Sequence, residues 1–124
     1  MTMPSDPHIL LVDDSPTFLA LLFHKLQQGG YRRLTTATSG REALEWLGIG
    51  KQGPMFIEPV DLILLDIIMP EMSGIEACRL IKEDERFRDV PVVMITGVND
   101  VSTLNGAFAA GAIDYILKPV RPVE

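Results

Sequence analysis

Short apolar runs recur along the chain and alternate with stretches of helical periodicity. The run at 8–12 is unbroken up to Asp13 and Asp14, which is typical of a strand buried on both faces of a parallel sheet. Comparable runs lie at 34–37, 62–65, 92–95 and 115–117. The pattern therefore predicts five strands.

Helical patterns separate these strands, over 16–28, 39–47, 75–82 and 101–110. The first opens with Ser15, a good N-cap, and Pro16, which is tolerated in the first turn, and it ends at Gly29. In the second, Ser39 precedes Glu42 by three positions, as in a capping box. Alternating strands and helices predict an α/β fold, with a doubly wound parallel sheet and helices on both faces.

The composition fits one ordinary domain of 124 residues, with 47% apolar and 23% charged residues. A chain of this length buries enough surface to fold without disulfides or a structural metal. Residues 1–7 are expected to form a disordered N-terminal lead, and residues 8–124 the domain. No apolar stretch approaches the roughly 20 residues that a membrane span requires.

The charge balance excludes further classes of protein. Eleven Lys and Arg against 17 Asp and Glu give a formal net charge of −6, and the sequence has no basic cluster of the kind that binds nucleic acid or anionic membranes. The single cysteine, Cys78, cannot form an intrachain disulfide, and the first residues lack the layout of a signal peptide. A reducing cytoplasm is the expected location.

Polar residues stand where the predicted strands end. Asp13 and Asp14 follow the first strand, Asp66 the third, Thr96 the fourth and Lys118 the fifth. Because the carboxyl ends of parallel strands lie at one edge of a sheet, these side chains are expected to converge there, where ligands bind. Carboxylates gathered in this way raise one another's pKa unless a hard divalent cation such as Mg²⁺ neutralises them. A carboxylate can also attack phosphorus when Mg²⁺ and an ammonium offset the negative charge.

Four motifs closely resemble the receiver domain of two-component response regulators, the chemotaxis-regulator-like family. They lie in the right order at 12–14, 64–74, 95–97 and 110–119, and the match runs from about His8 to Pro119. The resemblance implies a flavodoxin-like strand order, 2-1-3-4-5. It also implies a signalling domain of a bacterial phosphorelay rather than an enzyme, which accepts a phosphoryl group from a sensor histidine kinase or a phosphotransfer domain.

The same resemblance assigns a phosphoacceptor and a metal site. Asp66 would become the aspartyl phosphate. Asp13, Asp14, Asp66 and the backbone carbonyl of Ile68 would hold Mg²⁺ or Mn²⁺, with Asp14 the more direct ligand.

Three further roles follow from the resemblance. Lys118 would pair with the phosphoryl oxygens, and Thr96 would turn its hydroxyl toward them. Tyr115 matches an aromatic switch position that moves inward together with the threonine. Phosphorylation would thus shift a two-state surface.

The sequence departs from the usual family pattern at three places. The connection at 48–59 is long, and its apolar residues would cover the sheet edge or form a partner-specific patch. Ile68 and Val98 are apolar where many family members carry polar side chains. The chain stops at Glu124, before an expected fifth helix, so we expect a domain truncated before its last helix and a possible output domain in a longer natural chain. We also expect self-association through the face of the sheet that this last helix would cover.

Two alternatives come from other classes of protein. A phosphatase with an Asp nucleophile on a related sheet would want a second acid two residues after that nucleophile, where Ile68 stands. A nucleotide- or flavin-binding module would need a Gly-rich loop after the first strand, where Asp13 and Asp14 present carboxylates instead.

Overall fold

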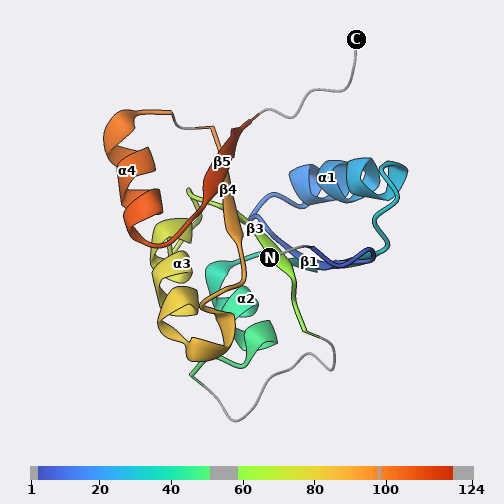
Figure 1. The fold of residues 1–124 in the computed structure, drawn as a ribbon. Coiled ribbons are helices and arrows are strands. Elements are labelled where there is room, and N and C mark those ends of the chain that lie inside the picture. Colours follow the sequence, from blue (N-terminus) through green and yellow to red (C-terminus); the bar gives the residue numbers. More distant parts are fainter. Residues whose placement is uncertain (1–2, 51–58, 98, 119–124) are drawn as a thin grey trace.

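A parallel sheet forms the centre of the computed structural model, which describes residues 3–50, 59–97 and 99–118 (Figure 1). Its strands are β1 (His8–Val12), β2 (Arg33–Ala37), β3 (Leu62–Asp66), β4 (Val92–Thr96) and β5 (Asp114–Leu117). All neighbouring strands pair in parallel, in the order β2-β1-β3-β4-β5. The predicted α/β class, the doubly wound five-stranded sheet and the order 2-1-3-4-5 are confirmed.

Side-chain caps define where the helices begin. The α-helices are α1 (Pro16–Gln28), α2 (Gly40–Leu47), α3 (Gly74–Glu83) and α4 (Val101–Ala109), and a short 3₁₀-helix, which the sequence patterns did not predict, is η1 (Glu85–Phe87). Ser39 caps α2 by accepting a hydrogen bond from the Glu42 N–H. The Glu42 carboxylate accepts from the N–H of Thr38, at 2.6 Å, so the return half of the expected capping box lies one residue earlier.

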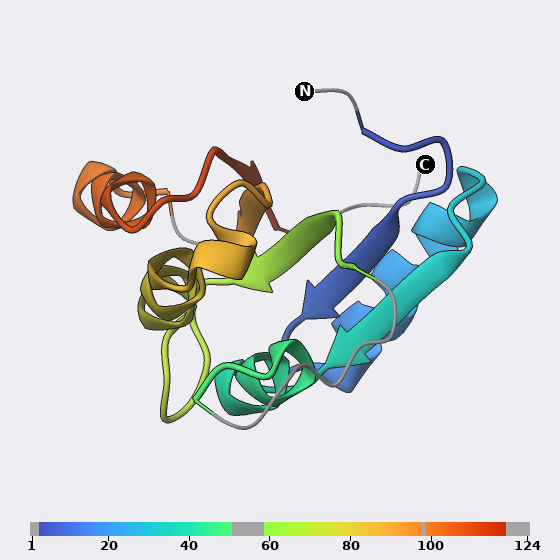
Figure 2. The ribbon, with the colours of Figure 1, turned by 60° about the horizontal axis from the view of Figure 1, so that its bottom comes forward.

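Two apolar clusters lie on opposite faces of the sheet. One is covered by α2, α3 and α4 and includes Ile63 and Leu65 of β3. The other includes Leu64 and is covered by Leu19 and Leu22 of α1 (Figure 2). Because β3 feeds both clusters, its run is continuously apolar rather than alternating.

The described chain contains four α-helices, which agrees with the expected absence of a fifth, although residues 119–124 lie outside the described part. None of the described helices is long and apolar enough to cross a bilayer. The segment 51–58 of the long connection and Val98 also lie outside the described residues. The disordered lead at 1–7 stays a prediction.

Candidate functional site

The turn between β1 and α1 fixes the first carboxylate of the site. Asp13 is buried, its N–H donates to the Ala37 carbonyl at 3.1 Å, and its Oδ1 accepts from the Ser15 N–H at 2.8 Å. Ser15 then caps α1, because its Oγ accepts from the Phe18 N–H at 3.2 Å. Asp13 is thus oriented by both β2 and the start of α1, whereas the next residue, Asp14, is exposed.

The second buried carboxylate lies at the end of β3. Asp66 is 4% exposed, and its Oδ1 accepts a hydrogen bond from the Ile68 N–H at 3.3 Å. The loop that follows closes tightly on the strand, since the Gly74 N–H donates to the Ile67 carbonyl at 2.8 Å. A Cβ at Gly74 would lie 1.9 Å from the Asp66 carbonyl oxygen, so only glycine allows α3 to begin this close to β3.

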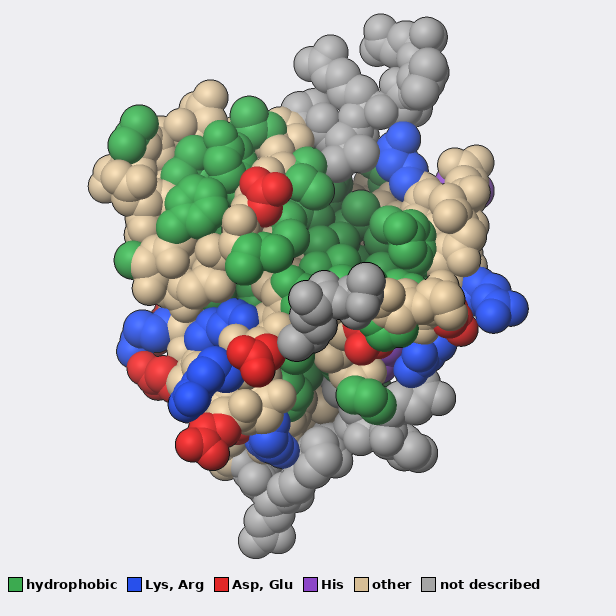
Figure 3. Space-filling model, viewed as in Figure 1, with side chains coloured by type: hydrophobic (Ala, Val, Ile, Leu, Met, Phe, Trp, Pro, Cys, Tyr) green, Lys and Arg blue, Asp and Glu red, His purple; other side chains and the backbone are tan. Residues whose placement is uncertain are grey.

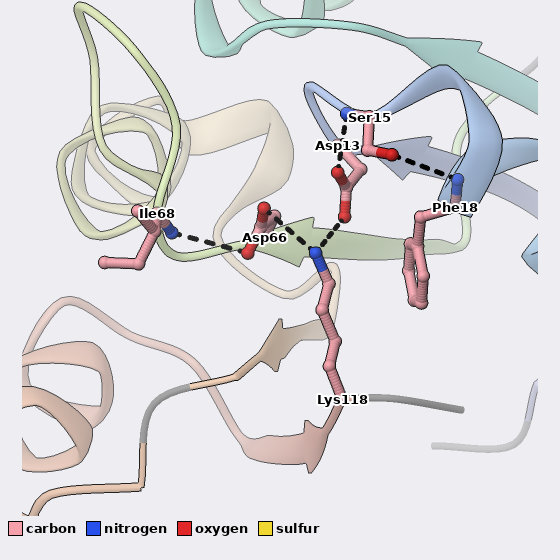
Figure 4. Close-up of polar contacts among 6 residues, drawn as sticks. All are labelled: Asp13, Ser15, Phe18, Asp66, Ile68 and Lys118. Atoms are coloured by element: carbon pink, nitrogen blue, oxygen red, sulfur yellow. Dashed lines mark hydrogen bonds and ion pairs between the residues drawn. The ribbon is translucent and has the colours of Figure 1, made fainter. Parts of the chain in front are cut away.

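Lys118, which follows β5, supplies the positive charge of the site. The Lys118 N–H donates to the Thr96 carbonyl at 2.7 Å, which ties the residue to the end of β4, where Thr96 is buried. The Lys118 Nζ lies 2.6 Å from Asp13 Oδ2 and donates to Asp66 Oδ2 at 3.2 Å (Figure 4). The structure therefore brings together residues from the ends of β1, β3, β4 and β5 at one edge, where the sequence pattern predicted them.

Negative charge exceeds positive charge at this edge. One carboxylate oxygen from each of Asp13, Asp14 and Asp66 lies within 4.8 Å of the others. Burial, and then the charge of Asp13, raise the pKa of Asp66 from its ordinary 3.8 to about 6, although Lys118 acts in the opposite direction. Burial alone would lower the pKa of Lys118, but its bonds to Asp13 and Asp66 outweigh burial and raise it.

A hard divalent cation fits the donor set of this cluster. All the candidate side-chain ligands are carboxylate oxygens, which Mg²⁺ and Mn²⁺ prefer. The buried Oδ2 of Asp13 forms an ion pair with the Lys118 ammonium at 2.6 Å. Such an oxygen retains lone pairs for a metal ion, so the residues present suit the cation that their types predicted.

Tyr115, the candidate switch residue, lies against α4. The half-buried Tyr115 packs edge to face against Phe108 of α4, with ring centroids 6.2 Å apart.

Phe18 lies beside the site, although the sequence patterns did not predict it there. Periodicity placed it only on the apolar face of the first helix, but its ring centroid lies 4.4 Å from the Lys118 Nζ. Its position three residues after the N-cap of a helix that opens beside Asp13 is the signal that could have placed it at this edge.

Known proteins of similar sequence are response regulators or contain a related segment. The family model for the response regulator receiver domain matches residues 9–124. The rice two-component response regulator ORR3 (Oryza sativa subsp. indica) is 34% identical over 124 residues, 99% of this chain and 88% of that protein. A Vibrio cholerae protein named probable cyclic di-GMP phosphodiesterase is 42% identical over 112 residues, 90% of this chain and 23% of that protein. The chain thus spans most of the first relative and less than a quarter of the second.

A solved receiver domain has a similar fold. The receiver domain of the sensor histidine kinase PA1611 from Pseudomonas aeruginosa PAO1 has a magnesium ion coordinated in its active-site cleft. It superposes on this chain with a TM-score of 0.78 at 28% sequence identity, covering 94% of this chain and 88% of that one. On its fold, its sequence and the family model that matches almost its whole length, the chain belongs to the response regulator receiver domain family.

Proposed function

We propose that Asp66 accepts a phosphoryl group from the phosphohistidine of a sensor histidine kinase or phosphotransfer domain. The observation that carries this proposal is a buried carboxylate that is hydrogen-bonded to a lysine ammonium beside two further carboxylates. Receiver domains are signalling domains, and in our proposal this one acts only on its own phosphorylation and dephosphorylation.

The proposed transfer exchanges one bond to phosphorus for another. An oxygen of Asp66 forms the new P–O bond while the P–N bond of the phosphohistidine breaks, and the leaving imidazole nitrogen keeps the electron pair and takes a proton from solvent. Lys118 already lies 3.2 Å from Asp66 Oδ2, so its ammonium is placed to pair with the transferring oxygens. Asp66 must be ionised to attack, and Lys118 favours that form.

Asp13, Asp14 and Asp66, with the backbone carbonyl of Ile68, would hold Mg²⁺ or Mn²⁺ in this proposal. The cation would supply the positive charge that offsets charge on the transferring oxygens. The hydrogen bond from the Ser15 N–H keeps Asp13 turned so that its Oδ2 faces the other carboxylates and Lys118. The magnesium ion in the Pseudomonas receiver domain supports the assignment.

The proposed switch joins the site to a surface for partners or an output domain. Thr96 is buried at the end of β4, and its carbonyl accepts the Lys118 N–H just after β5. Tyr115 of β5 contacts Phe108 of α4. Inward movement of Thr96 and Tyr115 would therefore change the packing of α4. The coverage of 23% of the Vibrio relative supports an output domain in a longer natural chain.

We also propose that copies of this chain associate with one another. Hydrophobic side chains spread from α4 across β5 toward α1 (Figure 3), and Ile116 of β5, on the α1 side of the sheet, is 47% exposed. We therefore expect copies of this chain to associate through that face. Sedimentation at micromolar concentration would test this, with Ile116→Lys shifting the chain toward monomer.

A cytoplasmic location is also part of the proposal. Cys78 is a buried free thiol, as a reducing compartment favours.

The phosphoacceptor is tested by intact mass after incubation with a small acyl phosphate and Mg²⁺. We expect the mass of one phosphoryl group, removable by hydroxylamine as an acyl phosphate is, and no adduct on Asp66→Asn. Continuous turnover of the donor without an adduct would favour the phosphatase alternative. An adduct of unchanged amount on Asp66→Asn would show that another residue is the acceptor.

A further inference from the structure

Phe18 is an uncharged neighbour of the Lys118 ammonium. The Lys118 Nζ lies over its ring, 4.4 Å from the centroid, while the same nitrogen lies 2.6 Å from Asp13 Oδ2 and 3.2 Å from Asp66 Oδ2 (Figure 4). An ammonium at this distance is attracted by the negative face of an aromatic ring. Among the described residues, the Lys118 ammonium therefore has two charged partners and one neutral partner.

The ring is held in place by the turn that also orients Asp13. The Phe18 N–H donates to the Ser15 side chain, and the Ser15 N–H donates to Asp13 Oδ1. The ring is half-buried and packs against the apolar cluster that α1 covers. Phe18 and Asp13 are thus two ends of one capped turn, and both face the same ammonium.

A divalent cation would compete with Lys118 for the two carboxylates but not for the aromatic ring. Asp13 and Asp66 are candidate ligands, so a metal ion competes with Lys118 for their oxygens. An aromatic ring offers nothing to Mg²⁺, which requires oxygen ligands. A lysine side chain has several rotatable bonds and a strongly hydrated head, and without a fixed partner its ammonium would spend much of its time in solvent. Of the partners that the structure describes for Lys118, the ring is the one for which a metal ion does not compete.

We propose that Phe18 is a positioning residue for Lys118, which keeps the ammonium beside Asp66 when a metal ion occupies the carboxylates. This inference rests on the proposed function of Asp66 as phosphoacceptor. The ring does not touch the phosphoryl donor in this proposal and acts only through Lys118. Its loss should therefore slow phosphoryl transfer modestly, and only in a protein that has the lysine.

The first test compares rates of phosphorylation by a small acyl phosphate at saturating Mg²⁺. We expect Phe18→Leu to slow the reaction about two- to fivefold, the range for one cation–π contact at a partly exposed site, and Phe18→Tyr to keep the rate. Phe23→Leu is the matched control, because Phe23 also lies on α1 and packs against the same apolar cluster. It should lower stability without slowing phosphorylation.

The second test repeats Phe18→Leu in a Lys118→Met background. If the ring acts through the ammonium, the substitution has no further effect on the rate there. Equal slowing in both backgrounds, or a wild-type rate for Phe18→Leu in the natural background, would overturn the inference.

Nuclear magnetic resonance of the Lys118 ε-methylene group separates this inference from the proposed function. In the wild-type protein with Mg²⁺, we expect a ring-current shift of this signal that Phe18→Tyr retains and Phe18→Leu removes. Absence of the shift in the wild type means that Phe18 does not hold the lysine, even if Asp66 is phosphorylated. A normal shift in a protein that accepts no phosphoryl group would instead refute the function of Asp66 and leave the contact standing.

Discussion

The Lys118 ammonium lies 2.6 Å from Asp13 Oδ2, although the two residues follow strands that are not neighbours. β1 and β5 are separated by β3 and β4, so the lysine side chain reaches across the edge of the sheet. Its ammonium supplies the counter-charge of this buried carboxylate oxygen. A divalent cation that binds Asp13 must therefore compete with this ammonium.

Removing the competing ammonium should tighten Mg²⁺ binding. We expect Lys118→Met to lower the dissociation constant for Mg²⁺ by about fivefold, or about 1 kcal/mol, since an unfavourable charge pair disappears from a partly exposed site. Isothermal titration calorimetry measures the constant. Arg79→Gln removes one positive charge from the exposed surface of α3 and controls for net charge. Weaker binding by Lys118→Met would contradict the competition.

Loss of the exposed carboxylate should act through the metal alone. Asp14→Ala is expected to raise the Mg²⁺ concentration that gives half the maximal phosphorylation rate by about tenfold or more, because one oxygen ligand is lost. The rate should recover at saturating Mg²⁺, since Asp66 and Lys118 are unchanged. The measurement is the initial rate of adduct formation across a Mg²⁺ titration. An Asp14→Ala protein that stays inactive at every concentration would give Asp14 a different role.

The raised pKa of Asp66 predicts how stability depends on pH. The folded protein binds this proton more tightly, with a pKa of about 6 against an ordinary 3.8, so the contribution of Asp66 is most favourable below about pH 4 and is lost as pH rises through about 6. Asp66→Asn cannot ionise, and at neutral pH without metal it should be more stable by about 1 to 3 kcal/mol.

Urea unfolding in the presence of a chelator measures this difference. The advantage of Asp66→Asn should shrink as pH falls from about 7 to about 4. Asp89→Asn, at an exposed carboxyl, is the control for removal of one negative charge. A difference that is independent of pH would show that ionisation of Asp66 is not its cause.

The side chain of Ile68 should influence how long the phosphoryl group persists. It is 59% exposed two residues after Asp66 and offers no group that could orient an attacking water. We expect Ile68→Asn to shorten the half-life of the aspartyl phosphate by about three- to tenfold, because an amide can position that water. Decay of the adduct is followed by intact mass. Ile113→Asn, also at an exposed apolar residue but before β5, should leave the half-life unchanged.

The strands were predictable because the sheet is buried on both faces. Leu64 and Leu65 enter different clusters, so no polar position interrupts the run, and Asp66 marks its end. Parallel pairing then places strand ends together, which is why Asp13, Asp66 and Lys118 could be predicted to converge. The helices α1 and α2 begin where their serine caps indicated, with the observed bounds one residue inside the cap.

Contacts between side chains from distant elements could not be predicted in the same way. Which carboxylate Lys118 meets depends on the lateral order of the strands and on its rotamer, and the pairing with Asp13 crosses two strands. Phe18 satisfies helical periodicity as an ordinary apolar residue, so periodicity alone does not reveal its contact with the ammonium. The 3₁₀-helix Glu85–Phe87 is too short to produce a periodic signal.

The close approach at Gly74 limits where this domain can bend. A Cβ added at Gly74 would lie only 1.9 Å from the Asp66 carbonyl oxygen, and the Gly74 N–H donates to the Ile67 carbonyl, so the end of β3 and the first turn of α3 are packed tightly together. The backbone of Asp66, the proposed phosphoacceptor, is therefore held in place by α3. If Asp66 is phosphorylated as proposed, we expect the resulting motion on the other side of the site, where the ends of β4 and β5 carry Thr96 and Lys118.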